Sequence, residues 1–355
     1  MPPRILIIKP SALGDVATTL PLLCDVRAAI PGAQIDWLIH PAYVPVIQGH
    51  DALHEAIVFD RKNLGAWWYR PSATRRFTGL LRTLRDRRYD IVIDAQGLFR
   101  SGFLTRVTGA KMRIGLAHAR EGAALTYTHK IRLPGKGKTM LAVERMRALG
   151  APLGTDSKSS AQFRLPLQAA GVQTAGGLAP DSFVAVIPGA RWNTKRWPIG
   201  RYAQVVEDLL DAGQNVVLIG APGEKPLCDA IATQIENRKS KMGGGEHLLN
   251  LAGQTDIATM IALLARARLV VANDSGPLHI AAALGTRVVA LYGPTSPRFV
   301  GPYGQMDAVL RHDVPCHPCR LRECDHHSCM NGLAVELVWQ RVAAKLDKQT
   351  RRQGD

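Results

Sequence analysis

The chain lacks several features that would place it in common protein classes. No apolar run in its 355 residues reaches the length of a membrane-spanning helix. The opening segment, MPPRILIIKPSALGD, has a short apolar run but no small-residue cleavage site. We therefore expect a first β-strand here, not a signal peptide, and a cytoplasmic protein.

Three nucleotide- and acyl-transfer motifs are also missing. The sequence contains no G-x-x-x-x-G-K-[ST], no G-x-G-x-x-G after the first strand and no G-x-S-x-G. A P-loop NTPase, a standard dinucleotide-binding enzyme and an α/β-hydrolase are therefore disfavoured.

Acidic residues are scarce relative to basic ones. The net charge is +16, and residues 61–120 hold fourteen Lys or Arg against three Asp. Phe77 to Arg88 reads as a basic amphipathic helix, whose simplest role is to cover the sheet with its apolar stripe. The alternative is a docking surface for a lipid-embedded anionic substrate. The concentration of charge favours an acidic partner: nucleic acid, an anionic membrane surface or a phosphorylated substrate.

Short β-branched runs alternate with helical patterns through both halves of the chain. This alternation predicts an α/β fold with two doubly wound, Rossmann-like domains facing across a cleft. We place an N-terminal domain at 1–165, a Gly/Ala/Pro-rich linker at 166–181 and a C-terminal domain at 182–335. A C-terminal helix and tail fill 336–355.

In the C-terminal half, three polar loops follow predicted strands, and ligands bind at this edge of parallel sheets. Lys195 could neutralise a phosphate, and Glu224 or Asp274 could accept hydrogen bonds from sugar hydroxyls. The NDSGPLH loop places a carboxylate beside a helix start that favours anions. Each residue alone could be structural, but together they predict a nucleotide-diphosphate site. Its residues are Lys195, Glu224, Asp274, Ser275, Gly276 and His279, with Thr255 at the predicted start of the preceding helix.

Asp15 follows the first strand, in the loop PSALGD. An Asp at this point is commonly a helix N-cap, and the local pattern favours that role. It could also be a carboxylate at the carboxyl end of the strand, able to act as a general base.

Five segments resemble glycosyltransferase family nine, the ADP-heptose heptosyltransferases: IIKPSALGDVATTLPLL, IDAQGLFRSG, PGARWNTKRWP, GAPGE and NDSGPLHIAAALGTRVVALYGPTSP. The resemblance implies a GT-B fold and an inverting transfer from ADP-L-glycero-D-manno-heptose to an acidic lipopolysaccharide inner-core acceptor. By position it implies that Asp15 is the base and that Lys195, Glu224 and the NDSGPLH loop bind the donor. The basic first half, including Arg61, Lys62 and Arg120, would bind the acceptor at the inner face of the inner membrane.

Four cysteines, Cys316, Cys319, Cys324 and Cys329, cluster near the C-terminus. Their spacing could hold a structural zinc ion, although reduced thiols remain an alternative. Cys24 and Cys228 lie in helical patterns and are expected to be buried thiols. The transfer itself is expected to need no cofactor.

Two alternatives to heptosyl transfer remain at this stage. One is a family-nine transferase with another nucleotide sugar and another surface glycan. The other is a nucleic-acid-binding protein that uses the basic face and the cysteine cluster, although we expect no nucleic-acid partner.

Overall fold

The computed structural model describes residues 2–60, 70–168, 178–239 and 247–350. The chain divides into two compact units, Met1–Pro166 and Leu167–Asp355, each built on a six-stranded parallel sheet. In the described residues no helix is both long and apolar enough to cross a membrane. Arg61 and Lys62, which are predicted to bind the acceptor, lie outside the described residues.

The first unit has strand order β3-β2-β1-β4-β5-β6. Its strands are β1 (Arg4–Ile8), β2 (Gln34–Ile39), β3 (Glu55–Val58), β4 (Ile91–Asp94), β5 (Met112–Leu116) and β6 (His129–Ile131). Its α-helices are α1 (Leu13–Ala17), α2 (Leu20–Ala29), α4 (Pro71–Asp86), α5 (Phe99–Val107) and α6 (Ala142–Arg147). Short 3₁₀ helices are η1 (Pro41–Val46), η2 (Ala123–Thr126), η3 (Pro134–Gly137) and η4 (Ala148–Leu153).

The second unit repeats this topology, with order β12-β11-β10-β7-β8-β9. Its strands are β7 (Phe183–Ile187), β8 (Asn215–Leu218), β9 (Leu248–Asn250), β10 (Leu269–Asn273), β11 (Val288–Tyr292) and β12 (Val309–Arg311). Its α-helices are α8 (Ile199–Asp211), α9 (Lys225–Lys239), α10 (Ile257–Arg266), α11 (Gly276–Ala283), α12 (Pro297–Val300), α13 (Ser328–Asn331) and α14 (Val335–Thr350). The 3₁₀ helices are η6 (Asn193–Lys195), η7 (Pro222–Glu224) and η8 (Met306–Ala308).

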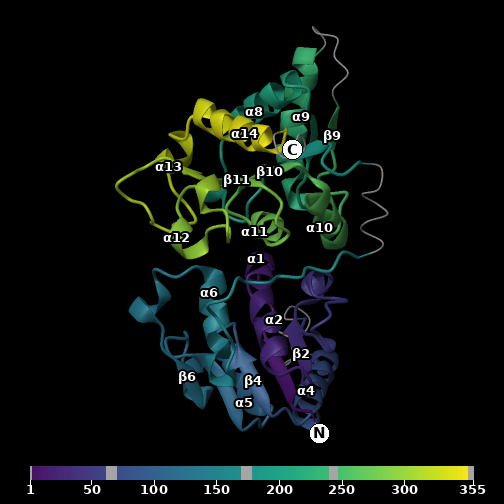
Figure 1. The fold of residues 1–355 in the computed structure, drawn as a ribbon, viewed down its shortest axis with the longest axis vertical. Coiled ribbons are helices and arrows are strands. Elements are labelled where there is room, and N and C mark those ends of the chain that lie inside the picture. Colours follow the sequence, from purple (N-terminus) through teal and green to yellow (C-terminus); the bar gives the residue numbers. More distant parts are fainter. Residues whose placement is uncertain (1, 61–69, 169–177, 240–246, 351–355) are drawn as a thin grey trace. The chain divides into compact units, whose positions relative to one another are not determined.

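The central strands are buried on both faces, as the continuous apolar runs predict. All four residues from Ile5 to Ile8 are inaccessible to solvent, and so are Val184 to Val186. Alternate side chains enter opposite helix layers. In the first unit Leu6 and Ile8 pack with α4 and α5, and in the second Val184 and Val186 pack with α8, α9 and α14 (Figure 1).

Both sheets have the strand order of a Rossmann fold, in which the order reverses between the first and fourth strands. The reversal lies between β1 and β4 in the first unit and between β7 and β10 in the second. In folds of this kind the loops at the carboxyl ends of the two strands diverge over opposite faces, and ligands bind in the crevice between them. The predicted α/β fold with two Rossmann-like units is confirmed.

Two local predictions were wrong. Apolar residues recur at helical spacing from Val16 to Ile30, which predicts a single helix, but the structure divides this segment between α1 and α2. The hydroxyls of Thr18 and Thr19 donate to the Asp15 carbonyl, at 3.1 and 2.7 Å, and Pro21 has no N–H to continue the first helix. The N-cap of α10 is Asp256, not Thr255, because Asp256 Oδ1 accepts from the Thr259 backbone N–H at 2.7 Å.

Candidate donor site and the residues around it

The loops that follow β7 and β10 are joined by Asn273, the last residue of β10. Its side chain is fully buried. Nδ2 donates to the Pro188 carbonyl at 2.7 Å, and Oδ1 accepts from the Trp197 backbone N–H at 3.2 Å. Asn273 therefore fixes both ends of the Pro188–Trp197 loop against β10. A buried amide that satisfies both loops makes this edge of the sheet rigid.

Asp274 is the centre of the site. It is 4 % exposed, and its Oδ2 accepts from Lys195 Nζ at 2.6 Å and from Thr295 Oγ1 at 2.5 Å. His279 Nε2, one helical turn into α11, lies 3.5 Å from Oδ1. The structure thus brings together three of the residues that the sequence singled out, Lys195, Asp274 and His279. Thr295 joins them from the loop after β11.

The Asp274 carboxyl is held in its ionised form. Burial alone would raise its pKa, but hydrogen bonding from His279 and the charge of Lys195 oppose this effect. The net result is a pKa lowered to about 2. Asp274 therefore stays ionised near neutral pH and is unsuited to exchange protons there.

Lys195 is a cation that keeps hydrogen-bonding capacity. Its Nζ lies 2.6 Å from Asp274 Oδ2 and 4.7 Å from the centre of the Trp192 ring, and the side chain is 17 % exposed. An ammonium group has three hydrogens, so the bond to Asp274 leaves two for a ligand. Arg322 lies over the same indole ring, 5.3 Å from its centre. These two cations favour an anionic ligand.

The start of α11 supplies donors beside Lys195. Ser275 is the N-cap, and the first-turn N–H groups of the helix have no acceptor within it. Pro277 contributes none. In the described part of the chain, Ser275 Oγ is shielded from solvent and has no hydrogen-bond partner. A buried hydroxyl without a hydrogen-bond partner destabilises the folded protein by about 1–3 kcal/mol. A ligand bound at this loop would supply the missing partner.

Glu224 lies in η7, after β8. Its Oε2 accepts from the Ala221 backbone N–H at 2.9 Å. A Cβ atom at Gly189, in the loop after β7, would overlap the Glu224 carboxylate. Gly189 is therefore what allows this carboxylate to lie against the neighbouring loop. Thr255 follows β9 at the same edge and is half-buried, without a contact that assigns it a role.

In the first unit Asp15 is exposed in the first turn of α1. Its Oδ2 accepts from the Ala12 backbone N–H at 3.1 Å. Asp15 is thus not the N-cap that the local pattern favoured, since Ala12 holds that position. The carboxylate faces solvent at the carboxyl edge of β1.

The loop after β4 lies next to the Asp15 loop, because β1 and β4 are paired. Asp94 is buried and accepts from the Gln96 and Gly97 backbone N–H groups, both at 2.9 Å, and from Tyr127 Oη at 2.6 Å. Lys9 Nζ donates to the Ala95 carbonyl at 2.9 Å. Arg120, predicted to bind the acceptor, is exposed beside this loop, where its N–H donates to the Gly97 carbonyl at 3.0 Å.

Two histidines of the segment 312–331 contact the loops that follow β7 and β11. The sequence did not indicate these contacts. His327 Nε2 lies 2.7 Å from the Thr194 carbonyl, directly before Lys195. His317 Nε2 lies 3.0 Å from the Thr295 carbonyl. A carbonyl only accepts, so both Nε2 atoms carry a hydrogen. The histidines were visible only as part of the cysteine cluster, and nothing in their spacing indicated which loops they contact.

The same segment carries the four clustered cysteines, all free thiols. Cys329 is buried and Cys316 is exposed. Burial, together with the neighbouring Cys319, Cys316 and Cys324, raises the pKa of Cys329. Over residues 2–60, 70–168, 178–239 and 247–350, the four sulfur atoms do not form a set of mutually close metal ligands. The geometry gives no support to the zinc hypothesis.

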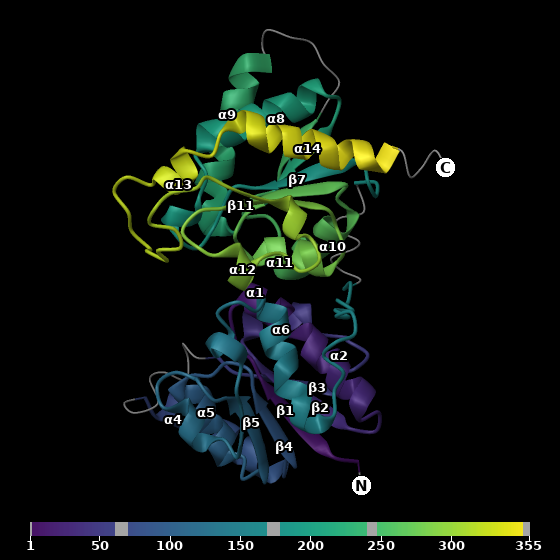
Figure 2. The ribbon, with the colours of Figure 1, turned by 60° about the vertical axis from the view of Figure 1, so that its left-hand side comes forward.

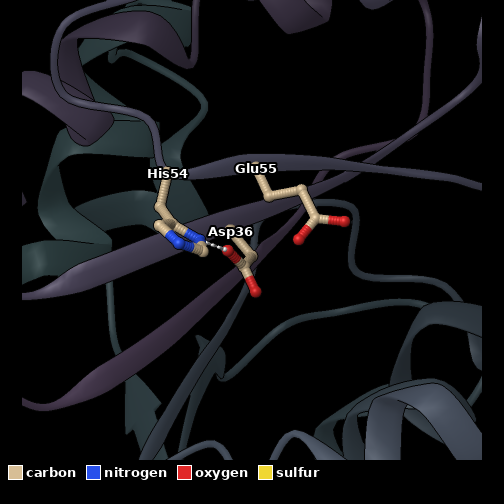
Figure 3. Close-up of side chains that lie close together, drawn as sticks. All are labelled: Asp36, His54 and Glu55. Atoms are coloured by element: carbon tan, nitrogen blue, oxygen red, sulfur yellow. Dashed lines mark hydrogen bonds and ion pairs between the residues drawn. The ribbon is translucent and has the colours of Figure 1, made fainter.

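One group in the described chain does bring three potential ligands within 4.8 Å: Asp36, His54 and Glu55 (Figure 3). It lies at the amino edge of the first sheet. Arg87 Nη1 bridges the two carboxylates, 2.8 Å from Asp36 Oδ2 and 2.7 Å from Glu55 Oε2. Tyr89 Oη also donates to Asp36, at 2.6 Å. A guanidinium ion in this position makes the group an ion-pair network that joins β2, β3 and α4.

The remaining two thiols lie in helices, Cys24 in α2 and Cys228 in α9. Cys228 is buried, as predicted, and burial raises its pKa to about 12. Cys24 is half-buried, with a pKa raised by burial to about 11. Neither thiol is activated as a nucleophile.

Comparison with known proteins assigns the chain to a family. Residues 77–329 match the model for glycosyltransferase family 9 (heptosyltransferase). Lipopolysaccharide heptosyltransferase 1 of Pseudomonas aeruginosa is 34 % identical over 337 residues, which cover 91 % of this chain and 88 % of the relative. The corresponding enzyme of Escherichia coli K12 is 32 % identical over 313 residues, covering 87 % and 93 %.

A solved structure, the E. coli heptosyltransferase WaaC with ADP, superposes with a TM-score of 0.78 and 26 % identity. The superposition covers 96 % of this chain and 99 % of WaaC. The two Rossmann-like units therefore form a GT-B fold, and the nucleic-acid-binding alternative loses its basis. The chain belongs to glycosyltransferase family 9 and is a glycosyltransferase.

Proposed function

We propose that the protein transfers a heptose from ADP-L-glycero-D-manno-heptose to an acidic acceptor of the lipopolysaccharide inner core, of the Kdo–lipid A type. The observation that carries this proposal is the group formed by Lys195, Asp274 and Thr295 at the start of α11. The group combines the Lys195 ammonium, the Asp274 carboxylate and N–H groups of α11 that have no acceptor within the helix. A nucleotide-diphosphate sugar requires donors for its phosphates and an acceptor for its hydroxyls. The relatives named lipopolysaccharide heptosyltransferase 1 support the donor and acceptor classes.

The second unit would hold the donor. Lys195 and the first N–H groups of α11 bind the diphosphate, and Ser275 Oγ satisfies its hydrogen bond there. Glu224 accepts from hydroxyls of the nucleoside, while Asp274 lies near the heptose. Because burial and ion pairing fix these groups in advance, they stabilise the charge that develops on the leaving ADP without reorganisation.

Asp15 would act as the general base. Its carboxylate takes the proton from an acceptor hydroxyl, whose oxygen attacks the anomeric carbon from the face opposite ADP. The new glycosidic bond forms as the bond between the anomeric carbon and the ADP oxygen breaks. Configuration at that carbon inverts, and ADP leaves with the electron pair. This step needs no metal or other cofactor, and zinc at the four cysteines is not part of the proposal.

The first unit would hold the acceptor. Arg120 lies beside the loop after β4, and we extend the acceptor site to Arg61 and Lys62 on the basis of sequence. A phosphorylated, lipid-linked acceptor matches the positive charge of this unit. Such an acceptor is embedded in a bilayer, so the protein would act as a peripheral enzyme at the inner face of the inner membrane.

Transfer assays with a Kdo-type acceptor test the proposal. Product should form with ADP-heptose and not with other nucleotide sugars, and a different preferred donor would support the alternative family-nine activity. Asp15→Ala should reduce the transfer rate by about 10²–10⁴-fold while the Kd for ADP, measured by calorimetry, stays within twofold. Asp211→Ala removes an exposed carboxylate at the end of α8 and should change neither quantity. Equal loss of ADP binding and transfer in Asp15→Ala would show that Asp15 is structural.

A further inference from the structure

Helix α5 exposes an unusual face. Phe99 is 62 % exposed and Phe103, one turn later, is 40 % exposed. Arg100 and Arg106 are exposed on the same helix, while Ser101, Gly102, Leu104 and Thr105 form its buried side. Two aromatic rings four residues apart lie on one face of a helix, so α5 presents an aromatic stripe flanked by arginines.

The short helix η2 extends this apolar face. A Cβ atom at Gly102 would lie 3.0 Å from Ala123 Cα, so the glycine is what lets η2 approach α5 closely. The Phe99 backbone N–H donates to Glu121 Oε2 at 3.2 Å, which holds the start of α5 to the η2 loop. Leu125 in η2 is 85 % exposed. Phe99, Phe103 and Leu125 therefore lie on two elements in direct contact.

These residues account for most of the exposed large apolar side chains in the described part of the first unit. The one other is Val58, at 50 %. An apolar side chain in water is ordinary, but their concentration on one pair of elements is not.

Basic residues surround the apolar face. Helix α4 contacts α5, and Figure 2 shows the two helices next to each other. The outer side of α4 exposes four arginines, Arg75, Arg76, Arg82 and Arg85. The Arg120 backbone N–H donates to the Gly97 carbonyl, just before the start of α5. The surface thus combines protruding aromatic and aliphatic groups with a positively charged margin.

The side chains of this surface favour a lipid bilayer over a protein as its partner. Exposed Phe and Leu side chains beside Arg are typical of elements that lie in the interface of a bilayer. The apolar groups enter the acyl region, and the guanidinium groups contact anionic headgroups. A protein partner would instead be matched by an apolar centre from which charges are depleted.

We propose that α5 and η2 form a docking surface for an anionic bilayer, with Phe99, Phe103 and Leu125 as inserted residues and the arginines of α4 and α5 as headgroup contacts. This inference rests on the proposed function in one respect: docking at this surface would bring the first unit to a lipid-linked acceptor in the bilayer. The proposal assigns membrane contact to a defined surface of the first unit, beside the Gly97 loop.

Co-sedimentation with vesicles tests the docking surface directly. The full chain should bind phosphatidylcholine vesicles that contain phosphatidylglycerol and should bind pure phosphatidylcholine more weakly. The triple variant Phe99→Ser/Phe103→Ser/Leu125→Ser should bind the anionic vesicles at least about tenfold more weakly, because it loses the three apolar side chains that would enter the bilayer. The control Val58→Ser/Leu337→Ser removes exposed apolar groups elsewhere and should bind like the unmodified chain. Circular dichroism verifies that both variants are folded.

Unchanged vesicle binding by the triple variant, or equal losses in the control, would overturn the proposal. Equal binding to neutral and anionic vesicles would overturn the role of the arginines. Transfer to a deacylated, water-soluble acceptor separates this outcome from failure of the proposed function. The triple variant should keep that activity, and absence of the activity in the unmodified chain would contradict the proposed function while vesicle binding still decides the docking surface.

Discussion

Asp274→Asn removes the anion at the centre of the donor site and should destabilise the second unit measurably. The Asp274 pKa falls from 3.8 to about 2 on folding, a difference of about 1.8. At 1.36 kcal/mol for each pKa unit, the ionised carboxylate contributes about 2 kcal/mol to the free energy of unfolding. For a unit of this size, that loss corresponds to a decrease in Tm of roughly 4–8 °C.

The pH dependence gives the prediction its sign. A carboxyl whose pKa is lowered by folding stabilises the protein above its ordinary value and loses that contribution as pH falls toward the folded value. Urea unfolding of the unmodified chain and Asp274→Asn should therefore differ by about 2 kcal/mol at pH 7. The difference should shrink below about pH 4.

Asp229→Asn is the matched control, because Asp229 pairs with Lys225 on the surface of α9. It should leave the free energy of unfolding unchanged within error. A difference between the unmodified chain and Asp274→Asn that is absent at pH 7, or that persists undiminished at low pH, would refute the reasoning that Asp274 is a stabilising anion.

Three further predictions concern other parts of the chain. Gly189→Ala should displace the flexible Glu224 carboxylate and weaken ADP binding about tenfold in calorimetry with little change in Tm, since one charge-assisted hydrogen bond is lost; unchanged affinity would exclude Glu224 from the nucleoside site. Arg87→Met should lower the free energy of unfolding by about 3 kcal/mol in urea titrations, because Asp36 is left buried beside Glu55 without its cation; stability like that of the unmodified chain would mean that the network is not structural. His327→Phe should raise the KM for the donor several-fold, and His327→Gln, which keeps a donor, should restore it in part; equal effects of both would contradict positioning by the Nε2 hydrogen.

The sequence was sufficient for the architecture because its signals are local and repeated. Apolar runs such as Ile5 to Ile8 predict strands buried on both faces, and their alternation with helices predicts two parallel sheets. The short edge strands β6 and β12 have only three residues each and were not predicted. Helix ends were least certain, as at Thr18 and Thr19, where side-chain hydroxyls compete with the backbone ladder.

The candidate site likewise contains residues that local sequence signals predict and residues that they do not. Lys195 and Asp274 could be placed at one edge because they follow strands whose carboxyl ends meet there. Thr295 and Asn273 could not be assigned roles, because their partners are 21 or more residues away and nothing in the local pattern specifies them. The contacts of His317 and His327 depend on the course of a loop with little regular structure, which no periodicity predicts.

The two units share a strand order but differ in the carboxylate that lies at the point where the strand order reverses. At its reversal point the first sheet has an exposed carboxylate, Asp15, whose backbone partner leaves it open to solvent. The second has a buried carboxylate, Asp274, with Lys195 and Thr295 already bound to it. An exposed carboxylate can accept a proton and release it, whereas one whose pKa is held near 2 cannot do so at neutral pH. In the proposed mechanism the acid–base work and the binding of the leaving group therefore belong to different carboxylates, and substitutions at Asp15 and Asp274 should affect different steps. Asp15→Ala should lower kcat with the ADP affinity intact, and Asp274→Asn should weaken ADP binding as well as transfer, so identical kinetic profiles for the two variants would contradict this division.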